Sequence, residues 1–240
     1  MTQPKPTIVL VHGAFAESAS WNGVVEQLQA NDMPVVAVAN PLRSLPGDAA
    51  YVRDVLASID TPVVLVAHSY GGMVITEAAA GSDKVAALVY VCAFAPDHGE
   101  SAFGLSTKFP GSTLGEALNA YPVSTGGNEL AIRPDVFHHQ FAADVSAATA
   151  AVMSATQRPA TELALTDGLP TDTPAWKTIP SWFVFSDGDL NIPFALHRFM
   201  ADRAGAKNVR EVRGASHALS VSQPGAVAAS IVEAASATAA

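Results

Sequence analysis

Six short apolar runs, rich in valine and isoleucine, constrain the fold of this chain more than any other feature. They span residues 7–11, 35–38, 63–66, 85–91, 181–185 and 208–212. Five runs are continuously apolar, as in parallel strands buried on both faces, and the last alternates with polar residues, as in an edge strand. Helical patterns separate the runs, and Asp48, Pro193 and Pro224 are expected to open three of these helices. The sequence predicts an α/β fold with a mostly parallel central sheet of about six strands and helices on both faces.

Residues 96–178 interrupt this alternation. The segment contains no convincing strand, many turn residues and scattered Phe, Trp and Met residues. Because a structureless loop of this length is rare in a compact domain, the segment is predicted to be a small helical cap insertion, with helices near residues 113–120 and 135–153. The α/β core would then consist of residues 1–95 and 179–240.

Composition narrows the possible partners and the compartment. With 13 basic and 22 acidic residues, the chain carries a net charge of −9, which argues against nucleic acid or an anionic membrane as a partner. Cys92 is the single cysteine, so no internal disulfide is possible and the multi-cysteine metal motifs do not fit. The longest apolar stretch, residues 85–95, is about half a membrane span, and residues 1–7 lack the apolar core of a signal peptide. We expect a cytoplasmic protein, monomeric or homodimeric, that binds no nucleic acid and no membrane.

The strongest chemical signal is Ala-His-Ser-Tyr-Gly-Gly at residues 67–72, directly after an apolar run and before a helical pattern. A serine nucleophile at a sharp strand-to-helix turn needs small residues two positions before and after it, so that strand and helix can approach. Ala67 and Gly71 meet this requirement. Ser69 is therefore the candidate nucleophile, and the backbone N–H of Tyr70, which begins the following helix, is available to a developing oxyanion.

A serine nucleophile needs a base, and seven histidines compete for that role. His68 flanks the serine and points away from it, His138 and His139 would diverge on a helix, and His197 looks like a helix surface residue. His217 follows the last predicted strand, at the carboxyl end of the sheet, where catalytic groups gather in open α/β folds. Asp187 and Asp189 both follow the strand at residues 181–185, and either could orient the imidazole.

Several motifs together resemble the α/β-hydrolase superfamily, in particular its small esterase and hydroxynitrile lyase-like branch. They are Val-Leu-Val-His-Gly-Ala at residues 9–14, His-Ser-Tyr-Gly-Gly at 68–72, Cys-Ala-Phe-Ala-Pro-Asp at 92–97, Asp-Gly-Asp-Leu-Asn-Ile-Pro at 187–193 and Ser-His at 216–217. The chain order of serine, acid and histidine is the one that this fold implies. Ala67 departs from the usual first glycine of the turn. The chain also starts at about the third strand of the family sheet, which implies six central strands rather than eight.

The resemblance implies a role for each of these residues. Ser69 would attack an acyl carbon, His217 would take and return the proton, and an aspartate would hold the imidazole tautomer. In the family, two variable residues, an aliphatic residue and often a proline follow the acid, a spacing that selects Asp189 over Asp187. The second oxyanion donor would be the N–H of Ala14, with the N–H of Phe15 as the fallback.

The insertion would cover Ser69 as a cap, and its large apolar side chains are candidates for a substrate pocket. The candidates are Phe103, Leu105, Phe109, Phe137, Phe141, Met153 and Trp176, together with Phe15 from the core. No cluster of Arg or Lys suggests that a phosphate or carboxylate is captured. The pocket is therefore predicted to accept an uncharged, hydrophobic substrate.

These observations predict a serine-dependent hydrolase of small to medium apolar carboxylic esters that needs no metal and no cofactor. A hydroxynitrile lyase is one alternative, although those enzymes carry a lysine directly after the triad histidine, where this chain has Ala218. Perhydrolase or cofactor-free oxygenase chemistry is another, because a fold does not dictate a reaction. A non-catalytic small-ligand receptor with a hydrolase fold is the alternative from a different functional class.

Overall fold

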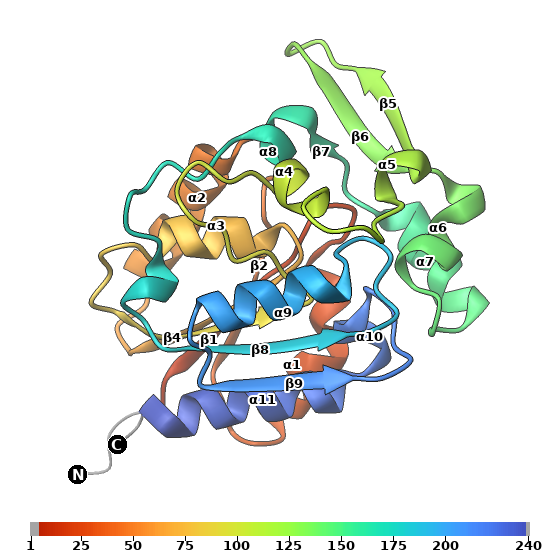
Figure 1. Cartoon of the computed structure of the whole chain (residues 1–240). Coiled ribbons are helices and arrows are strands. Elements are labelled where there is room, and N and C mark those ends of the chain that lie inside the picture. The colour runs from red at the N-terminus through yellow and green to blue at the C-terminus, as the bar shows by residue number, and fades with distance from the viewer. Residues whose placement is uncertain (1–4, 239–240) are drawn as a thin grey trace.

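The computed structural model describes residues 5–238, and its centre is a six-stranded parallel sheet (Figure 1). The strands lie in the order β2-β1-β3-β4-β8-β9. Their bounds are Val35–Val38 (β2), Thr7–Val11 (β1), Val63–His68 (β3), Val85–Val91 (β4), Ser181–Ser186 (β8) and Asn208–Val212 (β9). All neighbouring pairs are parallel, so the carboxyl ends of the strands meet at one edge of the sheet. The predicted sheet of six strands is confirmed.

Helices cover both faces of this sheet. On one face, α1 (Asn22–Gln29), which follows a 3₁₀ turn (η1, Ser18–Trp21), packs against α11 (Pro224–Thr238), and α10 (Leu219–Ser222) contacts both. On the other face, α2 (Leu45–Ala57) packs against α3 (Gly71–Ala78), and α9 (Phe194–Arg203) lies over β8. Because β1, β3 and β8 are covered on both sides, their residues are all buried.

Two of the three predicted helix starts agree with the structure, and one is wrong. Pro193 and Pro224 stand at the starts of α9 and α11. The helix expected to open at Asp48 begins instead at Leu45, where the Ser44 hydroxyl accepts a hydrogen bond from the Gly47 N–H at 3.3 Å. Asp48 is fully buried, and its carboxylate accepts hydrogen bonds from the Arg43 N–H and the Tyr70 hydroxyl.

The segment between β4 and β8 is not purely helical, which corrects the prediction for residues 96–178. It contains a small antiparallel sheet in the order β5-β6-β7, visible in Figure 1 as an arm beyond the main sheet. The expected helix at 113–120 is only one turn long, and the one at 135–153 is split in two. The elements are α4 (Ala102–Ser106), α5 (Leu114–Ala117), β5 (Leu118–Pro122), β6 (Asn128–Ile132), α6 (Pro134–Phe141), α7 (Ala147–Thr156), β7 (Ala160–Thr161), α8 (Glu162–Thr166) and η2 (Ala175–Lys177).

The hairpin of β5 and β6 has only a weak signal in the sequence. Leu118 pairs with Ile132 and Ala120 with Leu130, so apolar residues alternate on one face of the two strands. Gly126 and Gly127 in the connecting turn have φ angles of +95° and +76°, which suit glycine. Within residues 5–238, no helix is both long and apolar enough to cross a membrane.

Candidate active site

Ser69 occupies a strained turn between β3 and α3. Its φ angle is +55°, a left-handed conformation that side chains with a Cβ rarely adopt. Backbone hydrogen bonds hold it: the Ser69 carbonyl accepts from the N–H groups of Gly72 and Phe94, at 3.0 and 3.2 Å, and the Ser69 N–H donates to the Cys92 carbonyl at 3.1 Å. The turn presents the serine at the carboxyl edge of the sheet, as the sequence predicted.

Two glycines let α3 approach the strands closely enough to form this turn. A Cβ added at Gly71 would lie 2.6 Å from the Val11 carbonyl oxygen, and one at Gly72 would lie 2.0 Å from that of Phe94. Both contacts are with backbone, which cannot easily move aside. Ala67, which replaces the usual first glycine of the motif, is accommodated as a fully buried residue.

The structure brings His217 and Asp189 together. The Nδ1–H of His217 donates to Asp189 Oδ2 at 2.7 Å, and both side chains are buried. The backbone N–H groups of Asn191 and Ile192 donate to Asp189 Oδ1, at 2.8 and 2.9 Å. Burial by itself would raise the pKa of Asp189, but the neighbouring imidazoles of His217 and His197 hold that pKa well below its usual range. Asp189 is therefore ionised at neutral pH.

Asp187, the other candidate acid, makes a different contact. Its Oδ1 accepts a hydrogen bond from the Gly214 N–H at 2.6 Å, in the loop that follows β9. The sequence predicted that Asp187 would accept hydrogen bonds from N–H groups of its own loop, which is wrong. Asp187 therefore links the loop after β8 to the loop that carries His217. Within residues 5–238, its carboxylate makes no hydrogen bond to an imidazole.

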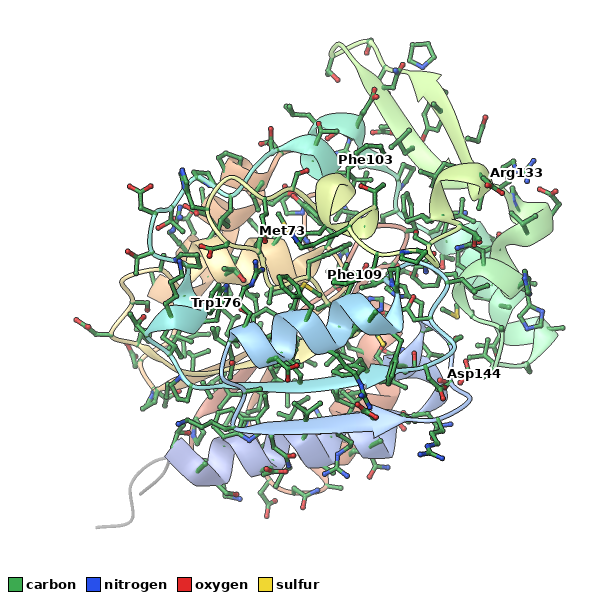
Figure 2. All side chains as sticks on the ribbon, in the orientation of Figure 1. Met73, Phe103, Phe109, Arg133, Asp144 and Trp176 are labelled. Atoms are coloured by element: carbon green, nitrogen blue, oxygen red, sulfur yellow. The ribbon has the colours of Figure 1, made fainter. Side chains whose placement is uncertain are left out.

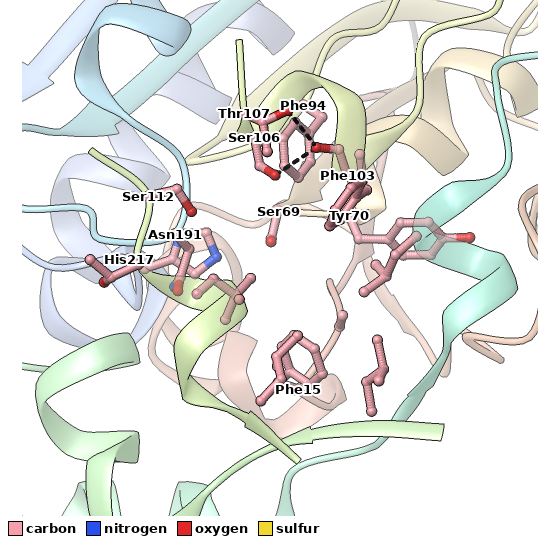
Figure 3. Close-up of a pocket in the computed structure, with 18 of the residues that line it drawn as sticks. Phe15, Ser69, Tyr70, Phe94, Phe103, Ser106, Thr107, Ser112, Asn191 and His217 are labelled. Carbon is pink, nitrogen blue, oxygen red and sulfur yellow. Dashed lines mark hydrogen bonds between the residues drawn. The ribbon is translucent and has the colours of Figure 1, made fainter. Parts of the chain in front are cut away.

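Ser69 and His217 face the same cavity, as Figure 3 shows. No hydrogen bond within residues 5–238 involves the Ser69 hydroxyl, so Ser69 and His217 are not joined in this conformation. Such contacts are often loose before a substrate binds. The Nε2 atom of His217 remains the imidazole nitrogen that Asp189 does not use.

Ala14 and Tyr70, whose backbone N–H groups are the expected oxyanion donors, line the same cavity as Ser69, and within residues 5–238 neither N–H group makes a hydrogen bond. The fallback donor, the N–H of Phe15, is already used, because it donates to the Arg158 carbonyl at 3.1 Å. The Tyr70 ring is anchored away from Ser69, since its hydroxyl donates to Asp48 Oδ2 at 2.9 Å.

His12 and His68 are buried histidines that support this arrangement. The Nδ1–H of His12 donates to the Gly13 carbonyl at 2.9 Å, and its Nε2 accepts from the Asn40 N–H, which fixes the loop before Ala14. The Nε2–H of His68 donates to the His217 carbonyl at 2.9 Å. Burial lowers the pKa of His12 to about 4 and that of His68 to about 3, so both rings are neutral at pH 7.

His197 is not a surface residue, contrary to the prediction. It is buried on the inner face of α9, and its ring stacks on Phe185 with a centroid distance of 4.9 Å. Its Nε2–H donates to Asp189 Oδ2 at 3.1 Å. Periodicity could have found its burial, because Leu196, His197 and Met200 share the inner face of the helix. Nothing in the sequence places His197 against Asp189.

Ser69 lines a cavity of about 660 Å³. Four of the predicted side chains line it: Phe15, Phe103, Phe109 and Phe141. The other candidates, Leu105, Phe137, Met153 and Trp176, do not line it. Phe137 stacks on Phe141, and the Trp176 indole donates to the Pro96 carbonyl. Figure 2 shows Trp176 apart from Phe103 and Phe109.

The remaining walls of the cavity are largely apolar and contain no basic residue. The lining includes Leu114, Leu118, Leu130 and Leu165, hydroxyl groups from Ser106, Thr107, Ser112 and Thr113, and the two acidic residues Glu116 and Glu162. Leu118 and Leu130 come from the β5–β6 hairpin. The small sheet that the sequence analysis missed therefore forms part of the cavity wall.

Within residues 5–238, one group of side chains has the spacing of metal ligands: Cys92, Asp189 and His197. Each Asp189 oxygen already accepts two hydrogen bonds, from Asn191 and Ile192 on Oδ1 and from His197 and His217 on Oδ2. These donors saturate the carboxylate. The three side chains therefore do not form a set of free metal ligands, because the oxygens of Asp189 are already in use.

Comparisons with known proteins agree with this architecture. An alpha/beta hydrolase, nvfD, of Aspergillus novofumigatus is 29% identical over 217 residues, which cover 82% of this chain and 83% of that protein. A carbendazim hydrolyzing esterase of a Nocardioides species is 48% identical over 63 residues, 24% of this chain and 26% of that protein. The crystal structure of polyneuridine aldehyde esterase superimposes with a TM-score of 0.81 at 22% identity, covering 96% of this chain and 99% of that chain, and so shares the fold. The model of the alpha/beta hydrolase family matches residues 8–230, and the chain therefore belongs to this family.

Proposed function

We propose that this protein is a serine-dependent hydrolase of small to medium apolar carboxylic esters. The observation that carries the proposal is the shared cavity of Ser69 and His217, with His217 Nδ1 hydrogen-bonded to the buried Asp189. A serine in a strained turn, a base and an orienting carboxylate are the three parts of a hydrolytic triad. The family match and the esterases among the similar proteins support the same reaction class.

In the proposed reaction, Ser69 Oγ attacks the ester carbonyl while His217 Nε2 takes the hydroxyl proton. The carbonyl oxygen becomes an oxyanion, which the free N–H groups of Ala14 and Tyr70 stabilise, each contributing about 3 kcal/mol. His217 then gives the proton to the departing alcohol, and an acyl group remains on Ser69. A water molecule, deprotonated by His217, releases the acid and restores the serine.

The cavity supports an apolar, uncharged substrate. Its volume of about 660 Å³ lies in the range typical of small-molecule sites, and its walls are largely aliphatic and aromatic. With no Lys or Arg in the lining, a phosphate or carboxylate on the substrate would find no counter-charge. We propose that the segment 96–178 acts as a cap that selects among such esters.

Other features of the proposal come from the sequence alone. The enzyme would act in the cytoplasm, as a monomer or homodimer, and without metal or cofactor.

The residue after His217 is the small, buried Ala218, where the resembling lyases have a lysine. No lysine or arginine lines the cavity to hold a cyanide leaving group. The lining therefore favours the hydrolase over the lyase.

A series of 4-nitrophenyl esters with acyl chains of increasing length tests the proposal. We expect turnover of the short and medium esters that a serine-directed phosphonate abolishes, with a mass increase on the tryptic peptide that contains Ser69. Prior incubation with a chelator should leave the rate unchanged. Binding of the esters without turnover, or turnover that the phosphonate does not affect, would overturn the proposal.

A further inference from the structure

We propose that His197 is a positioning residue of this active site, which shares the Asp189 carboxylate with His217 and thereby sets the pH range over which His217 can act as a base. This inference rests on the proposed serine hydrolysis. The juxtaposition that carries it is the meeting of two imidazoles on one carboxylate oxygen: His217 Nδ1 at 2.7 Å and His197 Nε2 at 3.1 Å from Asp189 Oδ2.

The carboxylate has no freedom to favour one imidazole over the other by rotating. Its other oxygen, Oδ1, is held by the N–H groups of Asn191 and Ile192. Because all four donors lie in fixed positions and the carboxylate is fully buried, its negative charge is divided among them. Removing one donor therefore changes the charge that faces the others.

The His197 ring is held as a neutral donor. It is buried against Phe185, and its Nδ1 atom has no hydrogen-bond partner in the described chain. A neutral ring with its proton on Nε2 satisfies Asp189, whereas a charged ring would bury a second, unpaired N–H. Burial also lowers the pKa of His197.

Few other ionisable groups face this ring. Asp189 and His217 are two of them. The third is the Cys92 thiol, directly after β4, whose sulfur lies within 4.8 Å of a His197 ring nitrogen and of an Asp189 carboxylate oxygen. Burial raises the pKa of Cys92, which therefore remains an uncharged thiol. The next residue on α9, Arg198, is directed elsewhere, where it pairs with Glu211.

The chemical consequence follows from the shared oxygen. A negative charge beside an imidazole stabilises the protonated ring, which cannot accept a proton from serine. The His197 N–H reduces the charge that His217 experiences, and so keeps His217 in its basic form at lower pH. It also holds the carboxylate plane toward His217 Nδ1, which keeps Nε2 directed to Ser69.

The test replaces His197 with two residues of similar size. His197→Gln retains an N–H donor, and His197→Phe retains the stacking on Phe185 without a donor. For His197→Phe we expect the acid limb of kcat/KM to move to higher pH by about one unit, with kcat lowered about tenfold and KM little changed. His197→Gln should remain within about threefold of the wild type at every pH. His138→Gln, on an exposed histidine of α6, is the matched control and should leave the profile unchanged.

The inference would be overturned if the glutamine and phenylalanine variants behaved alike, or if the acid limb of His197→Phe stayed in place. Nitrogen-15 labelling of the histidines adds a measurement that needs no substrate. We expect His197 to carry its proton on Nε2 at pH 8, and the His217 ring to titrate at higher pH in His197→Phe than in the wild type. The opposite tautomer, or an unmoved His217 titration, would reject the role of His197 even if esters proved not to be the substrates.

Discussion

The turn that carries Ser69 and the insertion that covers it are built in opposite ways. Residues 63–79, which include β3, the turn and all of α3, are buried throughout, and glycines there lie against backbone carbonyls. The insertion is mostly half-buried or exposed, and polar contacts attach it to the core, such as the pairing of Glu100 with Arg203 and the hydrogen bonds from the Gln140 amide to Leu190 and Asn191. The difference supports the proposal that the core carries the reaction while the insertion, which can vary more freely, selects the substrate.

Ser69→Ala should have the largest effect, because the reaction has no other nucleophile. We expect kcat/KM to fall by about ten-thousandfold or more, since triad members act as a unit. Stability and ligand binding should stay close to those of the wild type, because losing one hydroxyl at a cavity wall creates no internal void. Ester turnover and thermal unfolding, measured together, check this. If Ser69→Ala kept a tenth of the wild-type activity, Ser69 could not be the nucleophile.

The two aspartates after β8 provide a matched pair. Asp189→Asn should lower turnover by about a thousandfold, because an amide nitrogen would face histidine N–H groups that need an acceptor. Asp187→Asn keeps an oxygen for the Gly214 N–H and should cost tenfold or less. Steady-state kinetics of both variants decide the assignment. The reverse order of effects would make Asp187 the acid.

Acid should destabilise the core rather than the insertion. His12 and His68, in the core, are held neutral with pKa values of about 4 and 3, whereas His98, His138 and His139 in the insertion are exposed. As pH falls below about 6.5, the unfolded chain binds protons that the folded chain does not, so stability decreases. At pH 5 each buried histidine should lower the free energy of unfolding by about 2 kcal/mol relative to pH 7.

Urea unfolding at pH 7 and pH 5 measures this loss. His68→Gln should remove about 2 kcal/mol of the difference between the two pH values, and His138→Gln should leave it unchanged. Equal stability of the wild-type protein at both pH values would contradict the neutral state of the buried histidines.

Substitutions in the insertion should have the smallest effect on chemistry and a selective effect on substrates. Phe103 is exposed and lines the cavity, so Phe103→Ala should favour longer acyl chains by about three- to tenfold while the rate on the shortest ester changes little. Trp176→Phe, outside the cavity, is the control and should leave the preference unaltered. If Phe103→Ala slowed every ester equally, the insertion would have no part in selection.

Local sequence patterns were sufficient for the sheet and for the turn at Ser69. The strands were readable because continuous valine and isoleucine runs fit strands buried on both faces, and the nucleophile because a strained turn between strand and helix requires small residues. The hairpin of β5 and β6 was harder. Its short strands alternate only weakly, and one ends in Pro122, so no run stands out from the turn residues around it.

The sequence by itself determined the order of the strands and the places of Ser69 and His217 after two of them, since each depends on residues adjacent in the chain. Only the tertiary structure decided which side chains meet across it. His197, eight residues from Asp189, reaches the carboxylate because α9 turns its inner face toward the loop after β8. Phe137 and Trp176 are large and apolar, as pocket residues often are, yet they pack elsewhere. Local propensity specifies the element a residue belongs to, but its neighbours depend on how separate elements pack, and no local pattern encodes that.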